Sequence, residues 1–466
     1  MKMLSPLVLA ALSSLLLGGC ASFSTDGGFN AVESATRSHI QKDVVWPRDD
    51  AAREKLRQRV DALLEKPLTA DDAVQVALLN NPGLQAAFST LGIAEADRVA
   101  ATRLPNPGFT IGRATRGSEI EWERSLHFNL ARLLTMPMRA DIEQRLFEQT
   151  RRNLTLEVLR LASDTRKAWI AAVAANESAQ LQRDAMEAAE AGAELARRMA
   201  AAGNWSKLKQ AREQGFYADT AFAVARAEQA RTQSRERLVR LLGVTDPARV
   251  KLPNRLPELP ASLPPLPGVE QQAMDSRLDL QMVKLESEAL AKNLELTRRT
   301  RFINVLELGI ANNTSNQEQM QHGYEISFEL PLFDWGESRI AAAESRYRQI
   351  LERARATAVN ARSEVREAHA MLQSQYAVAR HVRDEVLPLK KRISEENLLR
   401  YNGMLIGVFE LLADARVQLA AANTAIESSR DFWLAEADLQ MALIGTPGKT
   451  LVTQAAASAP ADAGGH

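Results

Sequence analysis

Hydrophobic and polar side chains alternate along residues 324–330, and the period then changes. The apolar positions are Tyr324, Ile326, Phe328 and Leu330, and the polar ones between them are Glu325, Ser327 and Glu329. Beyond Gly336, apolar and small residues recur every three or four positions, at Ile340, Ala343, Tyr347, Ile350, Ala354 and Thr357. Period two is typical of a strand with one apolar face, and the longer spacing is typical of a helix. The pattern predicts a short amphipathic strand that leads into a long helix.

Three other stretches alternate in the same way. Their apolar positions are Phe109 and Ile111, then Leu126, Phe128 and Leu130, and then Leu306, Leu308 and Ile310. Polar residues such as Thr110, His127 and Glu307 stand between them. The sequence therefore predicts four short strands, two in each half of the chain.

Apolar and small residues at three- and four-residue spacing, bounded by glycine and proline breaks, predict the helices. We expect helices over Asp50 to Leu64, Leu84 to Arg103, 138–200, Ser206 to Leu242, Glu337 to Leu387 and Leu405 to Ile444. Thr69 is suited to cap a further helix, because Asp71 and Asp72 then lie at its positive end. A helix over 138–200 would be on the order of 90 Å long, which exceeds the diameter of an ordinary globular domain.

Glycine and asparagine mark the places where these helices turn or end. Gly203 and Asn204 predict a tip between two helices in the first half, and Gly403 predicts one in the second half. Gly243 and Gly445 end the last helix of each half. The two halves thus share the order helix, strand, strand, long helix, shorter helix, which indicates a tandem repeat.

A proline-rich stretch separates the two copies. Six prolines between Leu252 and Gly268 predict an extended connector. We predict a signal peptide over 1–19, a lead-in over 20–66, a first repeat over 67–250, the connector over 251–268, a second repeat over 269–446 and a disordered tail over 447–466.

Composition narrows the classes of function. The chain has 466 residues, 45% of them hydrophobic, and a formal net charge of zero, so it lacks the basic excess of a general nucleic-acid binder. The six histidines are scattered, and the sequence has no phosphate-binding loop and no nucleophile elbow. We therefore expect no enzymatic activity, no cofactor and no dedicated metal site.

The four strands allow two interpretations. In a water-soluble sheet their apolar face would cover a core of nearby helices, but the predicted helices are too long to curl over so small a sheet. In a membrane, one face would meet lipid and the other a watery lumen. Four strands cannot close into a barrel, because known membrane barrels have about eight or more. If the strands face lipid, several chains must build the barrel together.

The single cysteine lies in a specific setting. Lys2, the apolar run from Leu4 to Leu17 and the sequence Leu17-Gly18-Gly19-Cys20 resemble the signal peptide and lipobox of a bacterial lipoprotein. This resemblance implies cleavage before Cys20, which would carry the acyl chains, palmitate among them, and Ala21 is compatible with transport to the outer membrane. The alternative is an ordinary signal peptide with an incidental cysteine.

The chain resembles the TolC-like outer-membrane efflux protein family across about residues 67–445. The stretches that carry the resemblance are LTADDAVQVALLNNPGLQAA, ELPLFDWGESRIAAAESRY, RYNGMLIGVFELLADAR, RLVRLLG and QMALIG. The resemblance implies a mainly α fold with a small β-barrel portion. Three chains would form a homotrimer, with four transmembrane strands from each chain in the barrel and coiled-coil-like helices in an α-barrel reaching into the periplasm.

The same resemblance implies the function and the partners. The protein would be the passive exit duct of a tripartite efflux system, joined to a periplasmic adaptor protein and an inner-membrane pump, and it would export drugs, metal ions or other small solutes. Lipidation resembles the members that serve resistance-nodulation-division pumps. The alternatives are a duct of a type I protein secretion system, or a structural periplasmic lipoprotein without a channel.

The resemblance also points to candidate site residues. The strand residues facing outer-membrane lipid would be Phe109, Ile111, Leu126, Phe128, Leu306, Leu308, Tyr324, Ile326 and Phe328. A periplasmic gate would involve Arg400, Tyr401, Glu410 and Asp414, which are otherwise solvated charges at a helix end. The flanking aromatic residues Trp122, Tyr324, Phe333 and Trp335 would form an interfacial girdle or pack where strand meets helix.

Overall fold

A computed structural model describes residues 22–303 and 305–446, which divide into two compact units. The first unit takes in the chain up to Trp46, Pro82–Glu157 and Ser276–Asn360. The second takes in Pro47–Asn81, Val158–Asp275 and the chain from Ala361 onward. The predicted signal peptide, Cys20 and the tail 447–466 lie outside the described residues. The boundaries of the tandem repeat stay a prediction.

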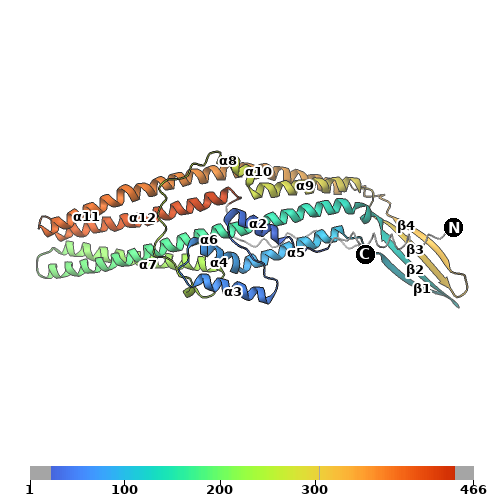
Figure 1. The fold of residues 1–466 in the computed structure, drawn as a ribbon, viewed down its shortest axis with the longest axis horizontal. Helices are drawn as coiled ribbons and strands as arrows, with labels where there is room; N and C mark the ends of the chain where they lie inside the picture. The colour runs from blue at the N-terminus through green and yellow to red at the C-terminus, as the bar shows by residue number, and fades with distance from the viewer. Residues whose placement is uncertain (1–21, 304, 447–466) are drawn as a thin grey trace. The chain divides into compact units, whose positions relative to one another are not determined.

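The first unit contains all four strands of the sheet. Its elements are α2 (Phe29–Ile40), α5 (Pro82–Thr102), β1 (Gly108–Arg116), β2 (Glu119–Asn129), the start of α6 (Leu130–Ala201), α9 (Leu278–Arg299), β3 (Leu306–Ser315), β4 (Gln321–Phe328) and the start of α10 (Glu337–His381). The strands form one antiparallel sheet in the order β1-β2-β3-β4 (Figure 1). The prediction of four short strands is therefore confirmed.

The register of the sheet fixes which side chains share a face. Phe109 pairs with Leu126, Leu126 with Ile310, and Ile310 with Tyr324, so one apolar row crosses all four strands. Directly paired residues point to the same side of an antiparallel sheet. Because the side-chain period is two, the alternation along each strand then places the other apolar positions on this side as well.

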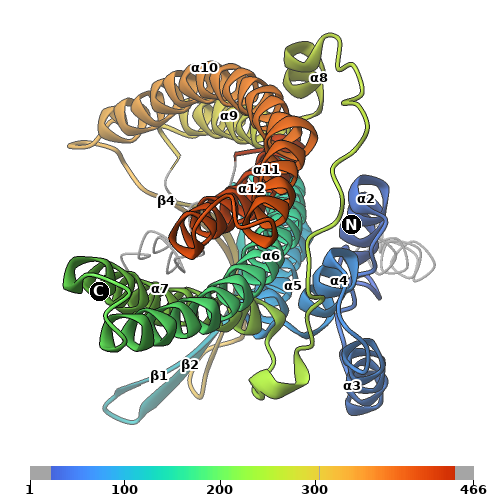
Figure 2. The same ribbon diagram turned by 90° about the vertical axis from the view of Figure 1, so that its left-hand side faces the viewer.

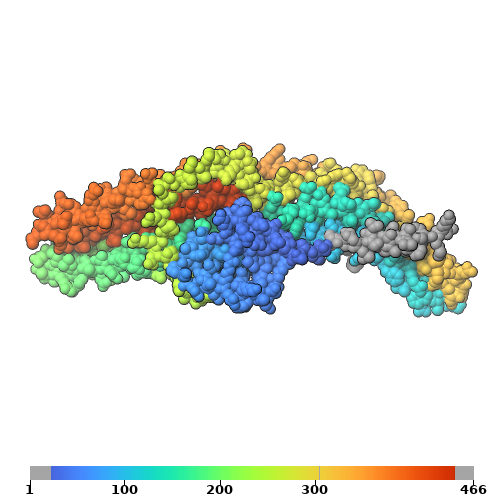
Figure 3. All heavy atoms as spheres, in the orientation of Figure 1, coloured from blue at the N-terminus to red at the C-terminus, as the bar shows by residue number. Residues whose placement is uncertain are grey.

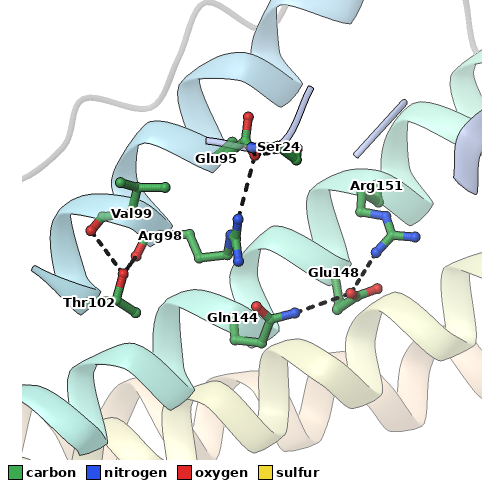
Figure 4. Close-up of polar contacts among 8 residues, drawn as sticks. All are labelled: Ser24, Glu95, Arg98, Val99, Thr102, Gln144, Glu148 and Arg151. Atoms are coloured by element: carbon green, nitrogen blue, oxygen red, sulfur yellow. Dashed lines mark hydrogen bonds and ion pairs between the residues drawn. The ribbon is translucent and has the colours of Figure 1, made fainter. Parts of the chain in front are cut away.

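Helices α2, α5 and the start of α6 pack together near the N-terminal lead-in. The ring of Phe29 contacts that of Phe88 edge to face, with centroids 5.0 Å apart. The Glu95 carboxylate accepts hydrogen bonds from the backbone N–H and the hydroxyl of Ser24, at 2.8 and 2.5 Å (Figure 4). The guanidinium of Arg98 lies 5.2 Å from the ring centroid of Phe147 on α6. These contacts fix the lead-in to α5 and α6.

Helix α6 begins earlier than the sequence predicts. We expected a start at residue 138, after Pro137, but α6 begins at Leu130 and includes Pro137. The side chain of Asn129 explains the early start, because its Oδ1 accepts a 2.7 Å hydrogen bond from the backbone N–H of Arg132 and so caps the helix. Pro137 removes one backbone bond without ending the helix.

Gly336 connects β4 to α10 in a conformation that favours glycine. Its φ is 76°, and a Cβ at this position would lie 2.8 Å from the carbonyl oxygen of Arg301. Gly336 therefore lets the chain turn from the sheet into α10.

Replacing Gly336 with alanine should lower the midpoint of thermal unfolding more than Gly117→Ala does. Both glycines have positive φ, but a Cβ at Gly117 would meet no atom within 4 Å. The left-handed conformation costs each alanine about 1–2 kcal/mol, and only Gly336→Ala adds a backbone clash. Equal midpoints for the two variants would contradict the clash.

The second unit is a bundle of long helices. Its elements are α3 (Asp50–Leu64), α4 (Ala70–Asn80), the rest of α6, α7 (Lys207–Leu242), the 3₁₀ turn η1 (Pro247–Arg249), α8 (Val269–Ser276) up to Asp275, the rest of α10, the π-helical turn η2 (Val382–Val386), α11 (Leu387–Asn402) and α12 (Val408–Ala442). Figure 2 shows α12 beside α11 and the end of α6 beside α7. Val365, Leu372, Tyr376, Phe432 and Leu439 form a buried core between α10 and α12.

Local capping explains where several of these helices begin and end. The Thr69 side chain accepts a hydrogen bond from the backbone N–H of Asp72, and the Asp72 carboxylate accepts one from the Thr69 backbone N–H, which completes a capping box. Gly243 ends α7 with a φ of 65°. The predictions for Thr69, for Asp50 to Leu64 and for Gly243 are confirmed.

The proline-rich connector lies against α10 and α12. The Tyr376 hydroxyl donates to the carbonyl oxygens of Pro260 and Ala261, and the Trp433 indole donates to that of Pro257. Figure 3 shows the connector, in yellow-green, as a band across α12. Because proline cannot donate backbone hydrogen bonds, the connector presents carbonyl groups that these two aromatic donors satisfy.

The long helix of the second half continues past its predicted end at Leu387. Its α-helical bonding gives way at Val382–Val386 to a π-helical turn, in which the Leu387 N–H donates to the Val382 carbonyl. Pro388 follows directly and lacks an N–H, so a wider turn in front of it relieves the clash with the preceding carbonyls. Helix α11 then runs to Asn402.

Candidate functional site

Every strand residue predicted to face lipid lies on one face of the sheet. The pairs that establish this are Phe109 with Leu126, Phe128 with Leu308, Leu308 with Ile326, Ile310 with Tyr324, Leu306 with Phe328 and Ile111 with Arg124. We call this side the apolar face.

The apolar face is uncovered in the single chain. Tyr324 is 82% exposed, Phe109 65%, Phe328 63% and Ile326 56%. Strands of 9, 11, 10 and 8 residues have about the length of membrane strands, which is roughly 9–11 residues. No helix in the described ranges is long and apolar enough to cross a membrane.

The opposite side of the sheet, which we call the polar face, carries carboxylates. The acidic side chains on it are Glu119, Glu121, Glu123, Glu307 and Glu325. His127 also lies there, and its Nε2 is 2.7 Å from the Ser125 hydroxyl. Arg116 is the basic residue at the β1–β2 turn on this side. The polar face is therefore acidic overall.

Aromatic side chains lie at both ends of the apolar face. Trp122 is exposed near the β1–β2 turn. At the other end Trp335 contacts Phe302 edge to face at 6.2 Å, and Phe333 is 99% exposed. Both interpretations of Trp335 therefore have a structural basis, because it packs at the junction of strand and helix and stays partly exposed.

The two helix tips have different turns. At the first tip Gly203 has a φ of 78°, and the Ser206 hydroxyl accepts from the Lys209 N–H to cap α7. At the second tip Gly403 has a φ of −81°, and Met404 takes the left-handed conformation instead, with a φ of 58°. Helices end at both predicted tips, but at the second tip the left-handed residue is Met404 and not the glycine.

Within the described residues, the side chains of the predicted gate residues form no hydrogen bond or ion pair with one another. Arg400 forms an exposed ion pair with Glu396 at 3.6 Å, while Tyr401 and Glu410 are exposed. The Oδ2 atom of Asp414 is buried and has no hydrogen-bond partner. These positions remain predictions for a gate that other chains would complete.

A buried ion pair that the sequence did not indicate links α7 to α12. Arg416 contacts the Glu213 carboxylate at 2.5 Å, and Glu213 is only 2% exposed. The Arg416 guanidinium also stacks 4.0 Å from the ring centroid of Phe216. The only sequence signal was a pair of opposite charges on two helices about 200 residues apart, which is too common to single out.

Other polar contacts join α6 to its neighbours in the second unit. Arg183 pairs with Glu228 on α7, and Lys167 pairs with Asp438 on α12 at 3.0 Å. Near the end of α6, Arg197 and Arg198 lower the pKa of Glu194 to about 2. Glu194 therefore stays ionised well below neutral pH.

A cavity of about 1030 Å³ lies between α6, the connector, α10 with η2, and α12. Glu177 lines it, and burial raises the pKa of this carboxyl although Arg255 lies 3.9 Å away. Within residues 22–303 and 305–446 no group of three or more His, Cys, Asp or Glu side chains is arranged to hold a metal ion.

This architecture is the fold of the TolC-like outer-membrane channels. A membrane protein from Pseudomonas aeruginosa has a TM-score of 0.69, with 19% identity over 82% of this chain and 94% of that chain. The outer-membrane channel OprN has a TM-score of 0.68, with 17% identity over 88% and 95%. The open state of the MtrE channel from Neisseria gonorrhoeae has a TM-score of 0.66, with 18% identity over 84% and 89%. No protein-family model and no curated protein matches the sequence.

Proposed function

We propose that this protein is the outer-membrane exit duct of a tripartite efflux system. The observation that carries the proposal is the uncovered apolar face, backed by an acidic polar face on the same four strands. Lipid would cover the first face, and water in a lumen would solvate the second. A water-soluble spacer would instead bury its apolar residues.

The duct would be a homotrimer. The sheet ends on β1 and β4, whose outer edges have no partner strand in the described chain. Backbone groups in lipid require partners, so β4 of one chain would pair with β1 of the next until the barrel closes. Acyl chains on Cys20 would add a second anchor to the outer membrane.

The helices would form the periplasmic tunnel and meet a periplasmic adaptor at their tips. An inner-membrane pump, of the resistance-nodulation-division type, would supply the energy and select drugs, metal ions or other small solutes. The duct itself would perform no chemistry.

The test is to purify the protein from membranes in detergent and measure its subunit number and single-channel conductance. We expect a trimer that conducts. A Cys20→Ala variant should still yield some membrane-inserted trimer, because the barrel is itself an anchor. A folded monomer released without detergent from that variant would refute the duct.

The acidic polar face predicts that the open channel prefers cations. In the double variant Glu307→Gln/Glu325→Gln we expect the reversal potential in a salt gradient to move toward zero, because charge in the lumen sets the preference. Glu318→Gln, in the loop between β3 and β4, is the matched control and should change it less. An unchanged reversal potential in the double variant would contradict a lumen on this face.

A further inference from the structure

Two arginines lie on the apolar face: Arg124 is near the middle of β2, and Arg113 lies one row closer to the β1–β2 turn. Arg124 is paired with Ile111, and Arg113 is paired with Trp122. The two arginines are therefore diagonal neighbours on adjacent strands, about 7–8 Å apart. Both are exposed.

Neither guanidinium has a hydrogen-bond or ion-pair partner within the described chain. The strand carboxylates lie on the other side of the sheet, so none of them can neutralise Arg113 or Arg124. The Arg113 guanidinium lies 5.7 Å from the ring centroid of Trp122, an aromatic contact that leaves its charge uncompensated. An arginine without a counter-charge is unfavourable beside hydrocarbon and favourable beside an anion.

The position of Arg113 and Arg124 along the strands indicates the chemical class of the anion that they would bind. Between Leu306 and Ile310 the apolar face holds only apolar side chains, and the rows nearer the turn hold Arg124 and then Arg113. The helix end of the sheet leads into long helices, so the turn end would reach the opposite leaflet of a membrane. Arginine and tryptophan are favoured at the level of lipid headgroups.

We propose that Arg113 and Arg124 bind the phosphate groups of anionic lipids in the leaflet that surrounds the β1–β2 turn. This inference rests on the proposed function, because it requires the apolar face to be in a membrane. The guanidinium groups offer planar, paired donors that match phosphate oxygens, and Trp122 orients one of them. In the proposed trimer there would be one such site on each chain.

The test uses the full-length protein purified in detergent. Diphosphoryl lipid A is the probe, its monophosphoryl form is the reduced-charge comparison, and native mass spectrometry counts the lipids retained per trimer. The test variant is Arg113→Gln/Arg124→Gln. The control is Arg116→Gln, which removes a charge from the same hairpin but on the polar face.

We expect the double variant to bind diphosphoryl lipid A about 25-fold more weakly, since each arginine near an anionic surface contributes roughly a fivefold gain in affinity. Arg116→Gln should bind as the unaltered protein does, and the monophosphoryl lipid should discriminate less between the proteins. Equal weakening by Arg116→Gln, or equal binding by all three proteins, would overturn the inference.

The outcome separates this inference from the proposed function. If all three proteins form conducting trimers but bind the lipid alike, the duct stands and the phosphate site is wrong. If none forms a membrane-inserted trimer, the proposed function fails first.

Discussion

Ile326→Arg should abolish assembly of the proposed membrane-inserted trimer, whereas Ser327→Arg, one residue further along β4, should leave it intact. The Ile326 side chain lies on the apolar face, and that of Ser327 lies on the polar face. An arginine near the middle of the lipid face costs about 2–4 kcal/mol per site, and a trimer would carry three such sites.

The measurement is the fraction of protein recovered from the outer membrane as a trimer that resists dissociation in detergent. Adjacent positions, the same new side chain and the same strand make Ser327→Arg a close control. If both variants assembled equally well, or if only Ser327→Arg failed, the assignment of the two faces would be wrong.

Arg416→Met should loosen the contact between α12 and α7. It leaves the Glu213 carboxylate buried without its positive partner, and removing one partner of a fully buried pair costs roughly 3–5 kcal/mol. Arg416 is partly exposed, so we expect about 2–3 kcal/mol here. Glu213→Gln in the same chain should restore part of this loss, because the double variant has no unpaired charge.

The direct measurement is the rate of amide hydrogen exchange in the first turns of α12, which should rise in Arg416→Met. Single-channel recording then reports whether the proposed tunnel opens more often. The control is Lys391→Gln, whose exposed pair with Glu395 on α11 should contribute less than about 1 kcal/mol. If Arg416→Met exchanged at the same rate as the unaltered protein, the pair would not hold α12 in place.

The strands and most helix ends could be predicted because local signals determine them. Period-two alternation located β1 to β4, and Thr69 and Gly243 carry side-chain or backbone preferences that act within a few residues. The face of every predicted lipid-facing residue followed from the same period, since a strand has only two faces.

The features that the sequence did not predict depend on contacts between distant residues, or on small free-energy differences between alternative local conformations. Pro137 was taken as a helix boundary, but the Asn129 cap made an earlier start favourable. At the second tip Met404 rather than Gly403 has positive φ, which no preference of either residue would suggest. The Arg416–Glu213 pair arises from the packing of distant helices.

The open edges of the sheet have a consequence for how the cell makes this protein. A newly made chain that has not met its partners presents two unpaired strand edges beside an uncovered apolar face. Such edges pair readily with any extended peptide. The yield of assembled protein would therefore depend on a chaperone that covers the edges and on rapid insertion into the membrane. In the proposed trimer, a defective chain with only one competent edge would pair with a normal chain on that side alone, and the ring would stay open. Damage to a single strand edge would then be genetically dominant.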